Sequence, residues 1–196
     1  MIELPELLVP DVEAWRAWLA ENHHSSPGAW LVLTRRGGSL TDVTYATALQ
    51  EALCFGWIDG QGRSRDEQSS LQRMTRRGPR SRWSARNVAF VAELEANGRM
   101  QPAGRAAVET AKADGRWAAA YAPPSEAVAP DDLLAAIAAV PEAQAMYDVL
   151  TRTNRYALLH RLGAVKRAET RERKIKGYVA MLARHETPHP QKARPS

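Results

Sequence analysis

The sequence has very little cysteine and no long apolar run, and each absence excludes a class of protein. Cys54 is the only cysteine among 196 residues, which excludes a disulfide framework and favours a small buried side chain. No apolar stretch approaches the roughly 18–20 residues that a membrane-spanning helix requires. The N-terminus carries acids where a secretory signal would carry basic residues. We therefore expect a cytoplasmic protein without a membrane span.

Motifs for metals, cofactors and nucleophilic catalysis are also missing. The five histidines do not stand at metal-ligand spacing with cysteine or acidic partners. Gly37 and Gly38 are not followed by the Lys-Ser/Thr pair of a phosphate loop, and neither Cys54 nor Ser84 has a base nearby in sequence. We expect no metal and no cofactor. The sequence leaves open whether the protein is an enzyme, and Asp59 is the only acid/base candidate.

Positive charge is concentrated in two segments of an otherwise acidic chain. The formal net charge is +5. Residues 61–90 contain eight arginines and two acids, and residues 150–196 contain twelve lysines and arginines and three acids. Such segregation creates a local potential that attracts anions even when the net charge is modest.

Residue periodicity predicts an α+β fold with a small, mostly antiparallel sheet packed with helices in the N-terminal half. A hydrophobic content of 44% and a charged content of 25% are typical of a globular protein. Apolar and β-branched runs predict strands over 28–36, 55–62 and 69–76. The last two runs are separated by a short polar loop, which predicts an antiparallel pair.

Helical spacing predicts the remaining elements and the organisation of the chain. Helices are expected over 11–22 and 44–55, and only helices after Ser84, because N-cap residues and glycine stops bracket the periodic segments. The predicted divisions are an α+β domain over 1–120, a proline-rich linker over 121–130, an all-helical segment over 131–186 and a tail over 187–196. The tail has no apolar residue worth burying, which predicts disorder.

The stretch CFGWIDGQGR, residues 54–63, places a carboxylate inside an apolar run. Alternation along a strand puts Trp57 and Asp59 on one face, and the neighbouring arginines offer Asp59 a partner. A purely structural ion pair is the plain alternative. One carboxylate cannot neutralise eight arginines, however, and guanidinium groups suit forked binding of carboxylate or phosphate.

We therefore predict a cleft that binds an anionic small molecule. Its lining combines aromatic rings, guanidinium groups and neutral hydrogen-bonding groups around one carboxylate: Trp57, Asp59, Arg63, Gln72, Arg73, Arg80, Trp83 and Asn87. We expect Asp59 to be largely buried and hydrogen-bonded to an arginine of residues 63–86. We also expect Trp57 or Trp83 to form a wall of a cleft that reaches solvent.

Several blocks of the chain resemble the YdeI/OmpD-associated family, also called bacteriocin-protection proteins. The blocks are SSPGAWLVLTRRG, VTYATALQEALCFGWIDGQGRS, LQRMTRRGPRSRWSARN, GRMQPAGRAAVETAKADGRW and VKRAETRERKIKGYVAML. The resemblance extends over most of residues 15–188, and it departs from the family pattern at Met74, Arg76 and Gly78. It implies a link to envelope stress and to tolerance of antimicrobial peptides, and it implies no reaction.

The basic helix near the C-terminus supports an alternative function. Its predicted buried stripe is Ile175, Tyr178, Val179 and Leu182. The basic side chains of residues 171–176 are then exposed, either as a solvated face or as an interaction module for nucleic acid or an acidic protein partner. No helix-turn-helix and no aromatic RNA-binding sheet is apparent, so nucleic acid is disfavoured. The sequence leaves a homo-oligomer open.

Overall fold

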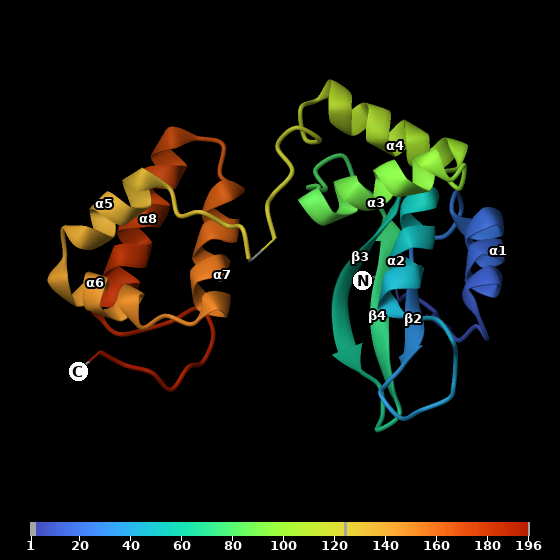
Figure 1. The fold of residues 1–196 in the computed structure, drawn as a ribbon, viewed down its shortest axis with the longest axis horizontal. Helices are drawn as coiled ribbons and strands as arrows, with labels where there is room; N and C mark the ends of the chain where they lie inside the picture. Colours follow the sequence, from blue (N-terminus) through green and yellow to red (C-terminus); the bar gives the residue numbers. More distant parts are fainter. Residues whose placement is uncertain (1–2, 124, 196) are drawn as a thin grey trace. The chain divides into compact units, whose positions relative to one another are not determined.

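Residues 3–123 and 125–195 are described by the structure, a computed structural model, and the chain divides into two units. The sheet unit is Met1–Ala120 and the helical unit is Tyr121–Ser196. Pro124 of the predicted linker and Ser196 of the predicted tail lie outside the described residues. Figure 1 shows the sheet within the first unit and helices alone in the second.

Four strands and four helices form the described part of the sheet unit. The strands are β1 (Glu6–Leu7), β2 (Ala29–Thr34), β3 (Trp57–Ser64) and β4 (Ser69–Arg76), and the helices are α1 (Val12–Asn22), α2 (Tyr45–Cys54), α3 (Ala85–Ala96) and α4 (Pro102–Ala113). The order in the sheet is β1-β2-β4-β3, and only the β1–β2 pair is parallel. The predicted fold class is confirmed. The two-residue edge strand β1 is the element that the sequence patterns did not predict.

Side-chain caps place the helix ends where the sequence predicts them. The Asp11 carboxylate accepts a hydrogen bond from the Ala14 amide at 2.8 Å, and the Ser84 hydroxyl accepts one from the Asn87 amide at 3.1 Å. Each contact satisfies an amide of the first turn that has no partner within its helix. Gly98, just beyond α3, has a φ of 66°, a left-handed conformation that glycine adopts without strain.

Helices α1 and α2 cover one face of the sheet. Trp15 and Leu19 of α1 belong to the same buried cluster as Leu31, Leu33 and Met74 of the strands (Figure 1). Leu31 and Leu33 alternate with residues that point to the opposite side, because successive side chains of a strand face opposite ways. We call that opposite side the outer face.

The helical unit has its own core. Of the stripe predicted for it, Ile175, Tyr178 and Leu182 are buried and Val179 is half-buried. Its helices are α5 (Asp131–Ala138), α6 (Pro141–Asp148), α7 (Arg152–Gly163) and α8 (Ala168–Ala183). The side chains of Leu133, Ile137, Met146, Leu158 and Leu182 are fully buried between them. No strand follows Arg76 in the described ranges, as expected. None of the helices that the structure describes is both long and apolar enough to cross a membrane.

The segment after α8 lies along the start of α7. The buried Asn154 amide donates to the His189 carbonyl at 3.1 Å and to Gln191 Oε1 at 2.8 Å, and its carbonyl oxygen accepts from the His189 amide at 2.8 Å. Gln191 Oε1 also accepts from the Thr151 amide at 3.1 Å. Buried polar groups require such partners. The sequence predicts disorder for this segment because it has no apolar residue to bury. The contacts given above are hydrogen bonds, which do not require apolar side chains.

Candidate functional site

The predicted tryptophans are core residues. Trp57 is 0% and Trp83 is 1% exposed. The Trp57 indole makes edge contacts with the rings of Trp15 and Trp18, at centroid distances of 6.5 and 5.7 Å, and its Nε1 donates to the His23 carbonyl at 3.3 Å. The prediction that one of the two tryptophans walls a solvent-reaching cleft is therefore wrong, because α1 closes over Trp57.

Trp83 is enclosed in a different way, just before α3. The Arg77 guanidinium carbon lies 3.5 Å from the Trp83 ring centroid, and the Trp117 ring meets it edge-on at 4.8 Å. Asn87, on the first turn of α3, is also buried. These contacts are typical of aromatic and cation–π packing in a core. Neither Trp83 nor Asn87 lines a groove with the predicted arginines.

Asp59 is half-buried and is held by a tyrosine. Its carboxylate accepts a hydrogen bond from Tyr45 Oη at 2.7 Å, and it forms no ion pair within the described residues. The prediction of a largely buried, arginine-bound Asp59 is wrong. β3 emerges from the core within three residues, from buried Trp57 to exposed Gly60. Asp59 therefore lies at the rim, within reach of the first turn of α2.

A bulge in β3 separates Asp59 from the arginines that follow it. Asp59 pairs with Met74, but Arg63 pairs with Leu71, and the register shifts between Asp59 and Gly62. Paired residues share a face of the sheet, so Asp59 lies on the helix-covered side with Met74. Arg63 lies on the outer face with Leu71, because an extra residue in one strand reverses the alternation.

Gln72 and Arg80 lie apart from the groove that Arg63 and Arg73 line. Gln72 Nε2 donates to the Gly60 carbonyl at 2.8 Å, a contact across the irregular part of the β3–β4 pairing. Arg80 is exposed in the loop that precedes α3. The structure thus brings together only two of the eight predicted residues, Arg63 and Arg73.

Arg63 and Arg73 line a groove of about 1050 Å³ on the outer face. All four strands contribute to this outer-face groove, and its lining is Glu3, Leu4, Pro5, Glu6, Trp30, Gln61, Arg63 and Arg73. Strand register sets its centre, since Glu6 pairs with Trp30 and Trp30 pairs with Arg73. Trp30 was not predicted as a site residue, because its apolar run indicates a buried strand.

The two arginines of the groove differ in their partners. The Arg63 guanidinium carbon lies 4.2 Å from the Trp30 ring centroid, and its Nη2 lies 3.5 Å from Glu6 Oε1. The Arg73 side chain is exposed, and among the described residues it has no acidic partner. Its aliphatic stem passes Gly60, where an added Cβ would stand 3.5 Å away. The groove therefore holds one paired and one unpaired guanidinium.

The buried carboxylate of the sheet unit is Glu51 and not the predicted Asp59. It is 2% exposed on α2 and forms ion pairs with Arg16, at 2.5 Å, and with Arg99. Burial opposes the charge of Arg16, but the hydrogen bond and charge of Glu51 prevail and raise the pKa of that guanidinium. The only sequence signal is the position of Glu51 within the apolar stripe of α2. Its partners stand 35 and 48 residues away along the chain.

Cys54 lies next to this buried ion pair and is not activated by it. Burial raises the pKa of the Cys54 thiol, and the negative charge of Glu51 raises it further. A thiol must ionise to act as a nucleophile. The structure thus supports the prediction that Cys54 is a small buried side chain.

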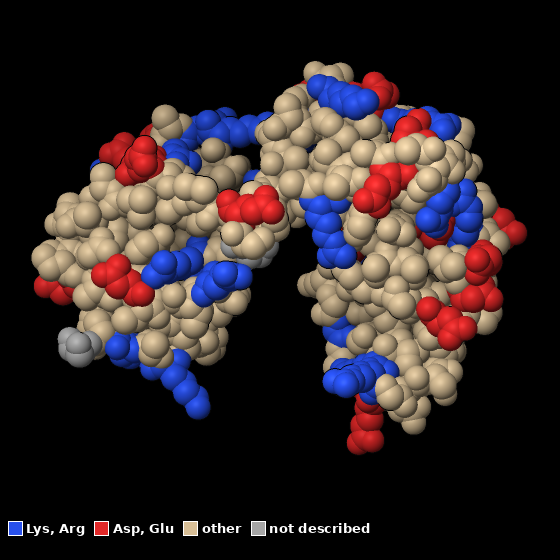
Figure 2. Space-filling model, viewed as in Figure 1, with Lys and Arg blue, Asp and Glu red and all other residues tan. Residues whose placement is uncertain are grey.

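Acidic and basic side chains lie close together on one face of the sheet unit and on α8. Figure 2 shows both signs interspersed on the visible side of the sheet unit. On the basic helix α8, Arg171 donates to the Asp132 carboxylate at 2.6 and 2.8 Å, and Lys176 pairs with Glu172 at 2.8 Å. The interaction-module alternative is not favoured, since acids of the same unit already pair with part of that basic face.

Two family models match the chain, one in each unit. Residues 7–107 match the model described as a domain of unknown function (DUF8412). Residues 126–185 match the model described as bacteriocin-protection, YdeI or OmpD-associated. Searches of the curated proteins and of the solved structures found no match.

The second match confirms the resemblance inferred from the sequence and places it in the helical unit. Of the blocks that carried the resemblance, only VKRAETRERKIKGYVAML lies within that match. The blocks around the outer-face groove fall in the first match instead. The chain therefore belongs, through its sheet unit, to the DUF8412 family of domains of unknown function, and its helical unit matches the bacteriocin-protection, YdeI or OmpD-associated family.

Proposed function

We propose that the outer-face groove binds a small anion that carries carboxylate or phosphate groups. The observation that carries the proposal is the exposed, unpaired Arg73, one strand from an Arg63 that is stacked on Trp30. Planar guanidinium groups bind carboxylate and phosphate through two parallel hydrogen bonds. Trp30 keeps the Arg63 guanidinium in place and offers an apolar surface to the organic part of the ligand.

The carboxylate of Glu6 would compete with such a ligand. Glu6 is shared between Arg63 and Arg65, at 3.5 and 3.1 Å, and all three side chains are at least one-third exposed. Ion pairs this exposed contribute at most about 1 kcal/mol, so an incoming anion can replace Glu6 at Arg63. Glu3 also lines the groove, so its carboxylate is a second negative charge near the proposed ligand.

Binding fits this groove better than catalysis. Asp59, the one acid/base candidate, lies on the helix-covered side of the sheet and accepts a hydrogen bond from Tyr45. It therefore faces away from a ligand held by Arg63 and Arg73. We propose that the bound anion serves tolerance of antimicrobial peptides, because the family description of the helical unit names bacteriocin protection.

Thermal denaturation with citrate or inorganic phosphate tests the proposed site. All six tryptophans lie in the sheet unit, so tryptophan fluorescence follows the unfolding of that unit. Citrate should raise the melting temperature in a saturable way, since a ligand at 100 times its Kd stabilises the native state by about 2.7 kcal/mol. Arg73→Gln should abolish this rise, and Arg63→Gln should reduce it.

Arg80→Gln is the matched control. It removes one exposed arginine that lies outside the groove, so the citrate effect should persist. A rise that does not saturate, or an equal loss in Arg80→Gln and Arg73→Gln, would contradict the site. In cells challenged with a bacteriocin, the wild-type protein should improve survival and Arg73→Gln should not.

A further inference from the structure

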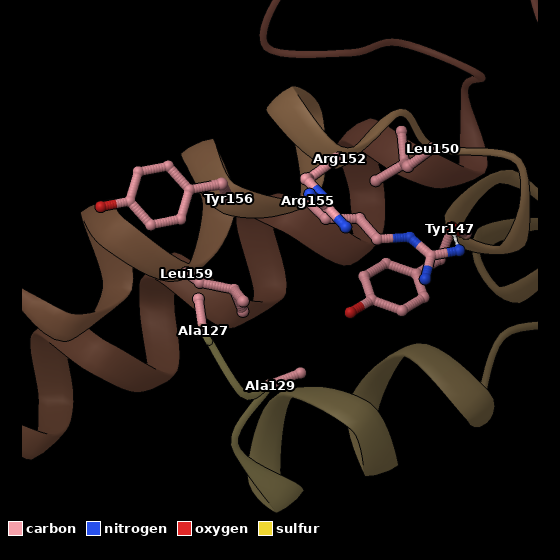
Figure 3. Close-up of a pocket in the computed structure, with 8 residues that line it drawn as sticks. All are labelled: Ala127, Ala129, Tyr147, Leu150, Arg152, Arg155, Tyr156 and Leu159. Carbon is pink, nitrogen blue, oxygen red and sulfur yellow. Dashed lines mark hydrogen bonds between the residues drawn. The ribbon is translucent and has the colours of Figure 1, made fainter. Parts of the chain in front are cut away.

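We infer a second binding site, in the helical unit, for a small carboxylate with an apolar body, such as an aromatic or short-chain acid. The site is a pocket of about 360 Å³, which we call the α7 pocket (Figure 3). It is lined by Ala127, Ala129, Tyr147, Leu150, Arg152, Arg155, Tyr156 and Leu159. Neither family description assigns a ligand to this unit.

The charged side of the pocket carries two arginines and no acid. Arg152 and Arg155 stand three residues apart on the first turn of α7, a spacing that brings side chains to one side of a helix. The start of a helix also carries partial positive charge. The carboxylate of Asp148 is close in sequence to these arginines, but its hydrogen-bond donor is Gln144, whose Nε2 donates to it at 2.7 Å. Neither arginine has an ion pair within the described ranges.

Arg155 is already held in position for an anion. Its Nη2 donates to the Tyr147 carbonyl at 3.2 Å and to the Asp148 carbonyl at 2.8 Å, and its guanidinium carbon lies 5.0 Å from the Tyr147 ring centroid. Carbonyl groups do not neutralise its charge. No described residue accepts a hydrogen bond from Nη1. A guanidinium that is ordered before binding loses less conformational entropy when a carboxylate arrives.

The other side of the pocket is apolar. Ala127, Ala129 and Leu159 line it, and Figure 3 shows the Tyr147 ring between the Arg155 guanidinium and these three side chains, with Leu150 on the side of the arginines. The volume is near the lower end of the roughly 300–1,000 Å³ of small-molecule pockets, which suits one ring or a short chain. Inorganic phosphate would leave the apolar wall uncovered, and a neutral ring would leave the arginines without a counter-charge.

Calorimetric titration of the full chain with benzoate tests this inference, with Arg73→Gln as the parent protein because the outer-face groove is also proposed to bind carboxylates. Benzoate should bind saturably, and benzamide and inorganic phosphate should bind this site at least tenfold more weakly. Arg152 is exposed, so Arg152→Gln should keep the fold, checked by far-UV circular dichroism, and should weaken benzoate binding about tenfold. Absence of benzoate binding to this parent protein, or equal binding of benzamide, would overturn the inference.

Two leucine substitutions, at Ala129 and at Val128, locate the ligand. Ala129→Leu fills the pocket without changing any charge and should abolish benzoate binding. Val128→Leu places the same leucine side chain at the neighbouring position, which is 84% exposed, and it should bind like its parent protein. Equal affinity in Ala129→Leu and Val128→Leu would overturn the assignment. Citrate stabilisation of the sheet unit should persist in Ala129→Leu made in the wild-type chain, so this site and the outer-face groove succeed or fail separately.

Discussion

The two units use similar basic segments in different ways. In the sheet unit, acids and rings from elsewhere pair with many arginines: Glu6 with Arg63 and Arg65, and Glu51 with Arg16 and Arg99. In the helical unit, the α8 charges are paired in part, and α7 presents two arginines to a pocket without an acid. An excess of positive charge in a segment therefore does not show where an anion binds. Our two proposals rest instead on guanidinium groups without an acidic partner that line a groove or a pocket.

The aromatic residues divide between the units as well. All six tryptophans lie in the sheet unit, and four of the five tyrosines lie in the helical unit. Trp57 and Trp83 are enclosed in the core, whereas Trp30 lines the outer-face groove. An indole can fill a core or line a groove. The element that packs over the ring decides which role it has.

The largest expected effect concerns the core role of Trp57. Trp57→Ala removes a fully buried indole and should lower the free energy of unfolding of the sheet unit by about 4 kcal/mol, as large-to-small core changes do. Asp59→Asn, two residues along β3, should cost less than about 1 kcal/mol, since a half-buried hydrogen bond is altered. Urea denaturation followed by tryptophan fluorescence measures both. A loss of about 3 kcal/mol or more in Asp59→Asn would contradict the structure and support a buried ion pair of Asp59.

The next effect concerns the buried ion pair of the sheet unit. Glu51→Gln leaves Arg16 and Arg99 without their carboxylate and should cost about 2 kcal/mol, less than the 3–5 of a fully buried pair because both arginines are at least one-third exposed. Glu95→Gln breaks the exposed Glu95–Arg105 pair and is the matched control. It should cost under about 1 kcal/mol. Equal costs in urea denaturation would show that burial of Glu51 has no energetic weight.

The smallest effect sharpens the contrast between paired and unpaired arginines. Glu6→Gln removes the internal counter-ion of Arg63, so citrate should bind the outer-face groove about threefold more tightly, within the range of an exposed ion pair. Glu13→Gln removes the same charge from an exposed position of α1 outside the groove. It should change the Kd of citrate little. Titration calorimetry measures both. Equal gains would mean that net charge, and not Glu6, controls anion binding.

Most of the fold could be predicted from local patterns. Caps such as Asp11 and Ser84 act over three residues, and apolar periodicity reports which side of a helix or strand is buried. The predicted site failed for a reason that is also physical. Gly60 and Gly62, either side of Gln61, are the sequence sign of a bulge, and the bulge moves Arg63 to the face opposite Asp59.

The amino-acid sequence by itself determined the α+β fold class, the positions of most elements and the relation to the bacteriocin-protection family, and it predicted that Arg63 and Arg73 lie together. These features depend on signals that act over a few residues. Only the tertiary structure decided that Glu6 and Trp30 join these arginines, that Glu51 is the buried carboxylate, and that Trp57 is enclosed. Those contacts join residues from 33 to 57 positions apart in the sequence. Strand order, register and one bulge set them, and no local pattern specifies their combination.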